Sequence, residues 1–206
     1  MSTEPLDEET RRQMQAAYFA MISLIDDNVG RMLECLERTG QRQDTIVIFM
    51  SDHGDMVGEH GLPHKGSRFY DPLVRVPLVV SWTGQYCQGL VSDALVELMD
   101  IAPTLLGEAR VTAPERMQGR SLSALLRGDA TSAHHRDFVR SEFYYALSPV
   151  GRSNVHGTYA TMYRDERYKL CVYHGHESGE LFDLQVDPGE FNNLWDVQDH
   201  QAQKLR

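Results

Sequence analysis

The sequence predicts an α/β fold, in which helices flank a mostly parallel sheet and a small antiparallel β subdomain follows at the C-terminal end. A long helical pattern leads into a continuous apolar run, which is typical of a strand covered on both faces. The last third instead has short runs separated by turn residues. Of the 206 residues, 41% are hydrophobic and 24% are charged, which is the composition of an ordered globular protein.

The first predicted element is a helix from about Glu8 to Thr39. Its apolar residues recur with the i, i+3, i+4 spacing that places side chains on one helix face. These residues are Ala17, Met21, Leu24, Ile25, Met32, Leu33 and Leu36. Gly40 is a natural end for the helix, because glycine readily adopts the left-handed conformation that terminates many helices.

Two continuous apolar runs predict buried strands, Thr45–Met50 and Arg75–Trp82. Pro77 is compatible with the second strand because it stands near the start. Between the two strands, Ser51–Asp71 is polar and glycine-rich, with the period of neither a helix nor a strand. Loops of this length inside compact domains are usually functional.

Short helices are predicted next in the chain. Asp100 is expected to cap a helix over Ile101–Leu106, and a second short helix is expected over Ser121–Leu126. Both lie in the part of the chain that is expected to supply the helices and strands of the α/β core.

A change in composition predicts a boundary between two parts of the chain. The segment Gly128–Arg136 contains mainly small and polar residues, and we therefore expect an α/β part at 1–130 and a second part at 131–206. The strands predicted in the second part are Phe138–Leu147, Tyr159–Tyr163, Lys169–Tyr173 and Glu180–Leu184. Turn residues between them favour an antiparallel sheet.

Charge and cysteine content restrict the partners and the compartment. Thirty acidic and twenty basic residues give a net charge of −10, which argues against a nucleic-acid or anionic membrane partner. The N-terminal segment MSTEPLDEETRR lacks the apolar stretch of a signal peptide, and no run is long enough to span a membrane. Cys35, Cys87 and Cys171 lie far apart in the sequence, which favours a reducing compartment, and the cytoplasm is the predicted location.

The predicted loop contains the residues most suited to chemistry, in the sequence SDHGDMVGEHGLPHKG. Asp52 and His53 directly follow a buried strand, at the edge of an α/β sheet where ligands bind. A carboxylate and an imidazole together suit a divalent cation, and Gly54 permits a sharp turn beneath them. The alternative is an Asx-turn at Asp52 with an exposed His53, and spacing alone leaves both interpretations open.

Lys65 lies in the same loop, and the chain contains only three lysines. Its ammonium group could bind an anionic oxygen of a substrate, or it could be an ordinary solvated surface charge. His60 and His64 could likewise donate to a ligand or be ordinary polar loop residues. Five further histidines are interpreted as solvated or structural, with exposure expected for His134 and His135, a hairpin tip for His174 and His176, and a loop for His156.

The order of the motifs resembles the C-terminal half of a type I sulfatase, within the sulfatase and phosphonate monoester hydrolase branch of the alkaline phosphatase superfamily. The segments that carry the resemblance are YFAMISLIDDNVGRMLECL, TIVIFM, SDHGDMVGEHGLPHKG and RVPLVV. Further similar segments are Leu95–Leu106, Gly119–Gly128, Arg164–Leu170 and Glu180–Leu194. Together they cover nearly the whole chain, and the resemblance implies a partial alkaline-phosphatase-like core.

The resemblance also implies roles for individual residues. In this family, the residues that correspond to Asp52 and His53 coordinate the divalent metal of the active site, which would be Ca²⁺, Mn²⁺ or Mg²⁺. The residue that corresponds to Lys65 contacts the sulfate oxygens and the leaving group, and His64 is a further candidate substrate contact. An imidazole ligand should make Mn²⁺ better tolerated than it is in a site made only of oxygen atoms.

The chain departs from the family pattern at the nucleophile. Family members carry Cys-x-Pro-Ser-Arg (or Ser in place of Cys), whose first residue is oxidised to formylglycine, and none of the three cysteines here precedes Pro-Ser-Arg. The pair Asp26-Asp27 lies within the predicted helix, so it does not correspond to the family's N-terminal acidic metal ligands. We therefore expect an N-terminal half to be missing and the chain alone to be inactive.

The expected function is metal-dependent hydrolysis of small sulfated esters by the intact enzyme. Phosphonate or phosphate monoesters are the alternative substrates, because a bound metal ion can stabilise the tetrahedral oxyanion of either ester type. A different class of function is a non-catalytic remnant or subunit that binds a partner, either the missing N-terminal half or a second copy. A free-standing metal-binding module is a third possibility, for which weak metal binding or none is expected.

Overall fold

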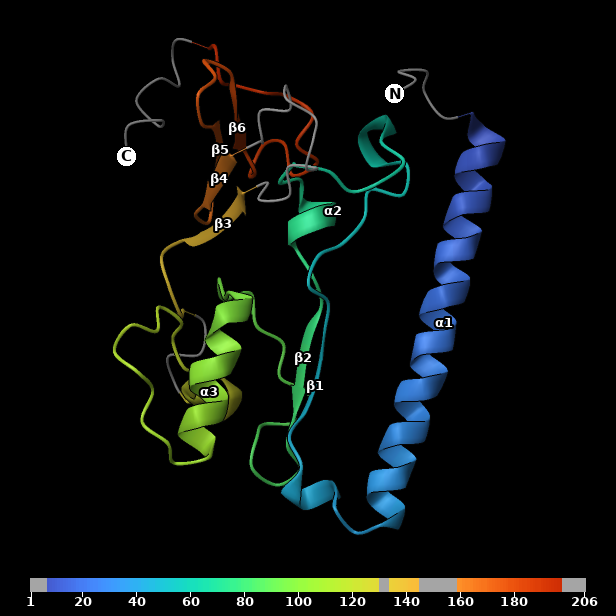
Figure 1. Ribbon diagram of the computed structural model, residues 1–206, viewed down its shortest axis with the longest axis vertical. Coiled ribbons are helices and arrows are strands. Elements are labelled where there is room, and N and C mark those ends of the chain that lie inside the picture. The colour runs from blue at the N-terminus through green and yellow to red at the C-terminus, as the bar shows by residue number, and fades with distance from the viewer. Residues whose placement is uncertain (1–6, 130–133, 145–158, 198–206) are drawn as a thin grey trace, which may run out of the picture. The chain divides into compact units, whose positions relative to one another are not determined.

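The structure is a computed structural model that describes residues 7–129, 134–144 and 159–197 (Figure 1). Contacts within the chain group these residues into two compact units. The first unit contains the residues up to Gly66, Pro72–Leu90 and Leu126–Gly128. The second unit contains Ser67–Asp71, Val91–Leu125 and the residues from Asp129 onward. The chain therefore passes between the units at five peptide bonds, one of which joins Asp71 to Pro72.

The first element is the long helix α1 (Glu8–Arg38), as its periodicity predicts. The Asp7 carboxylate caps it by accepting a hydrogen bond from the Thr10 backbone N–H at 2.8 Å. Glu8 and Glu9 add negative charge to the first turn, where the helix dipole favours it. Beyond the last turn, Gly40 has a φ of +68°, which is the left-handed conformation expected at the end of this helix.

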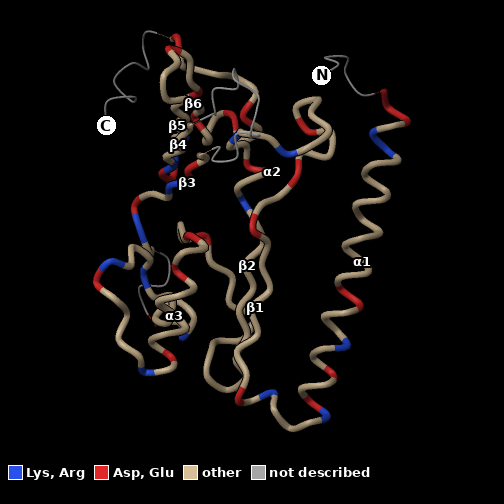
Figure 2. Tube along the Cα trace, in the orientation of Figure 1, with Lys and Arg blue, Asp and Glu red and all other residues tan. Residues whose placement is uncertain are grey.

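The apolar side chains of α1 are exposed. Among the described residues of the helix none is buried, and Phe19, Leu24 and Met32 are 64%, 62% and 67% exposed. No residue from Gln13 to Ile25 is charged, and Figure 2 shows this uncharged stretch of α1 in tan. The periodic pattern therefore predicts the helix correctly, but its apolar face is not covered by the described residues.

The next elements are two short strands, β1 (Val47–Met50) and β2 (Leu78–Ser81), which pair with each other. Their register is antiparallel, with Val47 opposite Ser81 and Met50 opposite Leu78. The expectation of a mostly parallel sheet is therefore wrong for this pair. The expected burial on both faces is also wrong among the described residues, since Phe49, Met50 and Val79 are 38%, 46% and 58% exposed. A continuous apolar run carries no information about the direction of the neighbouring strand.

Short helices follow each strand. The helix α2 (Asp71–Val74) was not expected, because four residues carry no periodic signal. The helices α3 (Ile101–Glu108) and α4 (Ser123–Leu126) lie where the sequence predicts short helices. A single 3₁₀ turn, Leu98–Asp100, leads directly into α3.

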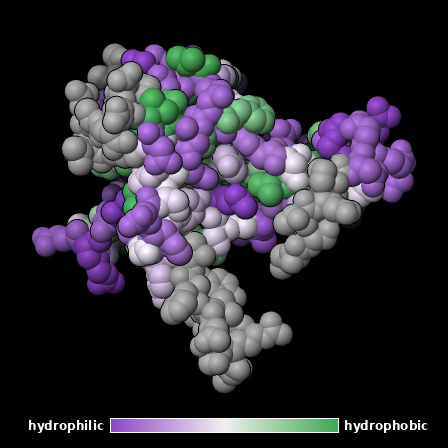
Figure 3. All heavy atoms as spheres, turned by 90° about the horizontal axis from the view of Figure 1, so that it is seen from above, coloured by the Kyte–Doolittle hydropathy of each residue, from purple (hydrophilic) through white to green (hydrophobic). Residues whose placement is uncertain are grey.

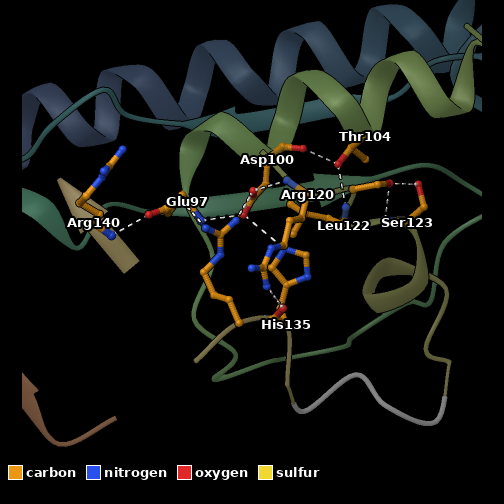
Figure 4. A network of polar contacts seen from close by, with 10 residues as sticks. Glu97, Asp100, Thr104, Arg120, Leu122, Ser123, His135 and Arg140 are labelled. Atoms are coloured by element: carbon orange, nitrogen blue, oxygen red, sulfur yellow. Dashed lines mark hydrogen bonds and ion pairs between the residues drawn. The ribbon is translucent and has the colours of Figure 1, made fainter. Parts of the chain in front are cut away.

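Asp100 is the centre of a buried polar network rather than a simple helix cap (Figure 4). Its carboxylate accepts hydrogen bonds from the backbone N–H groups of Glu97 at 2.9 Å and Arg120 at 2.7 Å. The Arg136 guanidinium forms ion pairs with both Asp100 and Glu97. Asp100 is fully buried and Arg136 is 8% exposed, so these charges depend on one another for stabilisation.

His135 belongs to the same network, which contradicts its expected exposure. Its side chain is 11% exposed, and its Nε2 atom lies 3.4 Å from Oδ2 of Asp100. Burial lowers the pKa of His135 below its ordinary value, although the neighbouring Asp100 carboxylate acts in the opposite direction. The polar residues around His135 predicted exposure. The carboxylate beside which its side chain is buried, that of Asp100, lies 35 positions earlier in the sequence, so no local pattern indicated the contact.

The C-terminal part contains four strands that pair antiparallel, as predicted, and their order in the sheet is β3-β4-β5-β6. They are β3 (Val139–Tyr144), β4 (Tyr159–Arg164), β5 (Tyr168–Tyr173) and β6 (Gly179–Asp183). Alternate side chains place the buried residues Ala160, Met162, Cys171 and Phe182 on one face of the sheet, and Leu181 is buried on the other face. The predicted strand end at 145–147 and the loop around His156 lie outside the described residues.

The three cysteines are all free thiols, and Cys171 is fully buried. Burial raises the pKa of the Cys171 thiol far above its usual range, so this thiol is unreactive.

Figure 3 shows a largely hydrophilic face of the molecule, on which apolar side chains occur separately. No helix in the described ranges has both the length and the apolar character needed to cross a membrane.

Candidate functional site

The loop after β1 brings Asp52, His53 and Lys65 together. The Lys65 Nζ atom lies 2.8 Å from Nε2 of His53, and that same Nε2 atom lies 3.9 Å from Oδ2 of Asp52. Twelve residues separate His53 from Lys65, so the loop must fold back on itself to make this contact. A carboxylate, an imidazole and an ammonium group therefore share one small region.

The hydrogen bonds of His53 determine which of its ring nitrogens carries the proton. Nδ1 lies 2.8 Å from the Gly54 carbonyl oxygen, which can only accept a hydrogen bond. Nδ1 is therefore the protonated nitrogen, and Nε2 offers its lone pair to the Lys65 ammonium group. The same lone pair would be available to a metal ion if Lys65 turned toward another anion.

Gly54 fixes the position of the Asp52-His53 turn. Its backbone N–H donates to the Leu73 carbonyl at 2.8 Å. A Cβ atom at this position would lie only 1.9 Å from the Pro72 carbonyl oxygen. The sequence suggests a sharp turn as the reason for Gly54, but the structural reason for a glycine is this close approach to the backbone of α2.

The middle of the loop contains strained backbone. Val57 has a φ of +46° and His60 has a φ of +52°, and such values are unfavourable for residues with a Cβ atom, most of all for a β-branched one. Met56 anchors this part of the loop with a fully buried side chain, and the Gly58 N–H donates to the Leu62 carbonyl at 2.9 Å. Strain of this kind persists where surrounding contacts impose it, and it is common near functional sites.

The chemistry of the donors fits a divalent cation, but the number of donors is small. Asp52 offers a hard oxygen and His53 a borderline nitrogen, which suits Ca²⁺, Mn²⁺ or Mg²⁺. Among the described residues, no group of three or more His, Cys, Asp or Glu side chains could hold a metal ion. The Asp52 and His53 side chains are 84% and 44% exposed, so water can reach the remaining coordination positions.

His64 does not join this group in the described part of the chain. It is exposed, and the contact that Lys65 makes is with His53. The sequence indicates Asp52, His53 and Lys65 as members of one loop. It contains no recognisable signal for the contacts that Pro72 and Leu73 make with Gly54.

Two family models match the chain. One is described as "Sulfatase" and matches residues 2–111, and the other is described as "N-sulphoglucosamine sulphohydrolase, C-terminal" and matches residues 58–206. Each match covers more than half of the chain, and both include residues 58–111, a segment that contains Lys65.

Curated proteins and solved structures are similar to the chain over most of its length. An N-acetylglucosamine-6-O-sulfatase of Bacteroides thetaiotaomicron is 31% identical over 89% of this chain and 32% of its own length. An arylsulfatase of Clostridium perfringens is 32% identical over 92% of this chain and 37% of its own length. The crystal structure of a phosphonate monoester hydrolase of Agrobacterium radiobacter gives a TM-score of 0.86 at 30% identity, covering 99% of this chain and 41% of that chain. The chain thus spans about a third of the length of the curated relatives it matches.

Proposed function

This chain belongs to the sulfatase family, and on that basis we propose that its Ser51–Gly66 loop supplies part of a site that hydrolyses sulfate esters. The observation that carries the proposal is the cluster in which His53 Nε2 approaches both Lys65 Nζ and the Asp52 carboxylate. Family membership supports the class of reaction, and the cluster supports the choice of the residues that would take part in it.

Asp52 and His53 are the proposed metal-binding residues. A divalent cation bound there would supply positive charge that polarises an ester oxygen. The Gly54 carbonyl holds the His53 ring so that Nε2, rather than Nδ1, faces the common region. An imidazole ligand should make Mn²⁺ acceptable alongside Ca²⁺ and Mg²⁺.

Lys65 is the proposed catalytic residue. Its ammonium group is a mobile point charge that can move from His53 to a negatively charged ester oxygen. In the transition state it would stabilise the charge that develops on the departing oxygen. His64, the neighbouring residue in the sequence, remains a proposed additional contact to the substrate.

Sulfated esters are the proposed substrates, and phosphonate monoesters are the alternative. The name of the Bacteroides relative supports a sulfated substrate. The TM-score of 0.86 with a phosphonate monoester hydrolase supports the alternative, because the same fold serves that reaction in another protein. Both ester types present a tetrahedral group with anionic oxygens, which a cation and a lysine can bind.

The nucleophile is proposed to come from another polypeptide segment. No cysteine of this chain stands in Cys-x-Pro-Ser-Arg, so the three cysteines do not fit a formylglycine. The exposed apolar side chains of α1 support a partner that covers them, and a sulfatase N-terminal part suits this role better than a second copy because it would also complete the site. If no such part exists, the chain would be a non-catalytic remnant.

Two further properties follow from composition. A net charge of −10 supports a partner other than nucleic acid or an anionic membrane. Three free cysteines support a reducing compartment, and we propose the cytoplasm as the location.

Hydrolysis assays test the proposed function. We expect the purified chain alone to show no turnover of an aryl sulfate, and turnover to appear when a sulfatase N-terminal polypeptide with its formylglycine is added. In that mixture, Lys65→Met should lower kcat by about 100-fold or more, because a charge aimed at the transition state is removed. The assay is repeated with an aryl phosphonate monoester.

The control variant is Arg116→Met, which removes an exposed positive charge outside the loop and should leave kcat unchanged. Turnover by the chain alone would contradict the proposed division of the site. Equal rates for Lys65→Met and Arg116→Met would contradict the role of Lys65. Faster turnover of the phosphonate ester than of the sulfate ester would establish the alternative substrate.

A further inference from the structure

Lys169 is a fully buried lysine that the proposed chemistry does not use. It lies on β5 and is 0% exposed, although lysine is seldom fully buried without partners. Its Nζ atom forms ion pairs with Asp71 and, at 2.5 Å, with Oε1 of Glu190, and it donates to the Phe69 carbonyl at 3.1 Å. Lys169 therefore ties down the short segment that follows the Lys65 loop, about a hundred residues earlier in the chain.

Glu190 fixes the backbone of the same segment. Its Oε2 atom accepts a hydrogen bond from the Asp71 N–H at 2.7 Å, while its Oε1 atom pairs with Lys169. The Glu190 side chain is 1% exposed, and its backbone has a φ of +59°, a left-handed conformation that is unfavourable for glutamate. The contacts of both carboxylate oxygens stabilise this conformation of Glu190. Asp71 is therefore held through its side chain by Lys169 and through its main chain by Glu190.

The residues directly after Asp71 hold the metal-binding turn. Pro72 and Leu73 continue α2. The Pro72 carbonyl oxygen lies so close to Gly54 that a Cβ atom there would be 1.9 Å away, and the Leu73 carbonyl accepts the 2.8 Å hydrogen bond from the Gly54 N–H. Gly54 in turn follows Asp52 and His53. The chain therefore contains a continuous series of contacts and covalent bonds from Lys169 to the proposed metal ligands.

We propose that Lys169, Asp71 and Glu190 form a positioning cluster, which holds α2 and thereby the turn that carries Asp52 and His53. This inference rests on the proposed function only in that the function makes Asp52 and His53 metal-binding residues. The contacts themselves make it testable without any activity. The alternative is a purely structural role, in which the cluster stabilises the C-terminal sheet and has no effect on Gly54.

Hydrogen exchange of individual amides in the 206-residue chain distinguishes these roles. In Lys169→Met, we expect the Gly54 amide to exchange at least about tenfold faster, because α2 loses its anchor and the bond to Leu73 opens more often. The amides that pair β1 with β2 should keep their rates, since those strands pair through their own ladder. The control is Arg167→Met, which removes an ion pair with Asp183 beside β5, and this variant should leave Gly54 unchanged.

A second variant covers the case in which Lys169→Met does not fold. Glu190→Gln keeps the size of the side chain but has one acceptor oxygen in place of two, so it can serve either Lys169 or the Asp71 N–H and not both. We expect faster exchange at Gly54 in this variant too, with the amides of β4, β5 and β6 still protected. Unchanged exchange at Gly54 in the folded variants, or an equal increase in Arg167→Met, would overturn the positioning role.

Metal binding separates this inference from the proposed function. If the chain binds Mn²⁺ at Asp52 and His53, Lys169→Met should raise the apparent dissociation constant, while Arg167→Met should not. A lack of Mn²⁺ binding even after the sulfatase N-terminal polypeptide is added would contradict the proposed metal site. The exchange rate at Gly54 would still decide whether the cluster positions the turn.

Discussion

Gly54→Ala is expected to destabilise the protein and displace the turn that carries Asp52 and His53. The new Cβ atom would lie 1.9 Å from the Pro72 carbonyl oxygen, and backbone atoms cannot rotate away as a flexible side chain can. The turn must move away from α2, and the 2.8 Å hydrogen bond to Leu73 lengthens or breaks. Overpacking against backbone typically costs about 1–3 kcal/mol of the free energy of unfolding.

Urea denaturation measures this effect, with Gly66→Ala as the control. Gly66 lies in the same loop, and a Cβ atom there would meet nothing within 4 Å. Its substitution should therefore change the free energy of unfolding by less than about 0.5 kcal/mol. Equal denaturation midpoints for the two variants would show that Gly54 does not approach Pro72 as closely as described.

Arg136→Met is expected to destabilise the second unit even more strongly. The guanidinium forms ion pairs with Asp100 and Glu97, and the Asp100 side chain is fully buried. Removing Arg136 leaves a buried carboxylate without its compensating charge. Breaking such a buried pair from one side typically costs about 3–5 kcal/mol. Thermal unfolding should show a clearly lower midpoint.

Arg140→Met is the matched control for this substitution. It removes the same charge from a neighbouring position, but the Arg140 side chain is 45% exposed and pairs with a partly exposed Glu142. Exposed ion pairs contribute at most about 1 kcal/mol. A similar loss of stability in Arg136→Met and Arg140→Met would contradict the stabilising role of the buried network.

Periodicity and turn residues were sufficient to predict most elements of the fold. The spacing of apolar residues and the glycine at position 40 indicated α1, and short runs separated by turn residues indicated the antiparallel C-terminal sheet. The direction of β2 was not predictable, because a continuous apolar run looks the same beside a parallel or an antiparallel neighbour. The role of Asp100 was also missed, since its partner Arg136 is remote in the sequence.

The candidate site was predicted less completely than the fold. The loop sequence indicated Asp52, His53 and Lys65, which do lie together, because all three belong to one continuous segment. Lys169 stood out only as one of three lysines. Its link to Asp71 depends on tertiary contacts between segments about a hundred residues apart, and no local pattern in the sequence encodes such contacts.

Asp52 and His53 are central to the proposed hydrolase because they are expected to hold a divalent cation beside Lys65. Titration with paramagnetic Mn²⁺ tests this most directly, because the ion broadens the NMR signals of the residues nearest to it. We expect weak binding, with a dissociation constant on the order of millimolar, since the described residues supply only two donors. Broadening should be strongest at His53 and Gly54, and Asp52→Ala should abolish it.

Asp55→Ala is the control, because it removes the same charge from the same loop. The Asp55 carboxylate accepts a hydrogen bond from the Met56 N–H at 2.8 Å and makes no contact with His53 among the described interactions. This variant should keep the broadening at His53. Broadening centred on other residues, or an equal loss in Asp52→Ala and Asp55→Ala, would contradict the metal site and with it the proposed hydrolase.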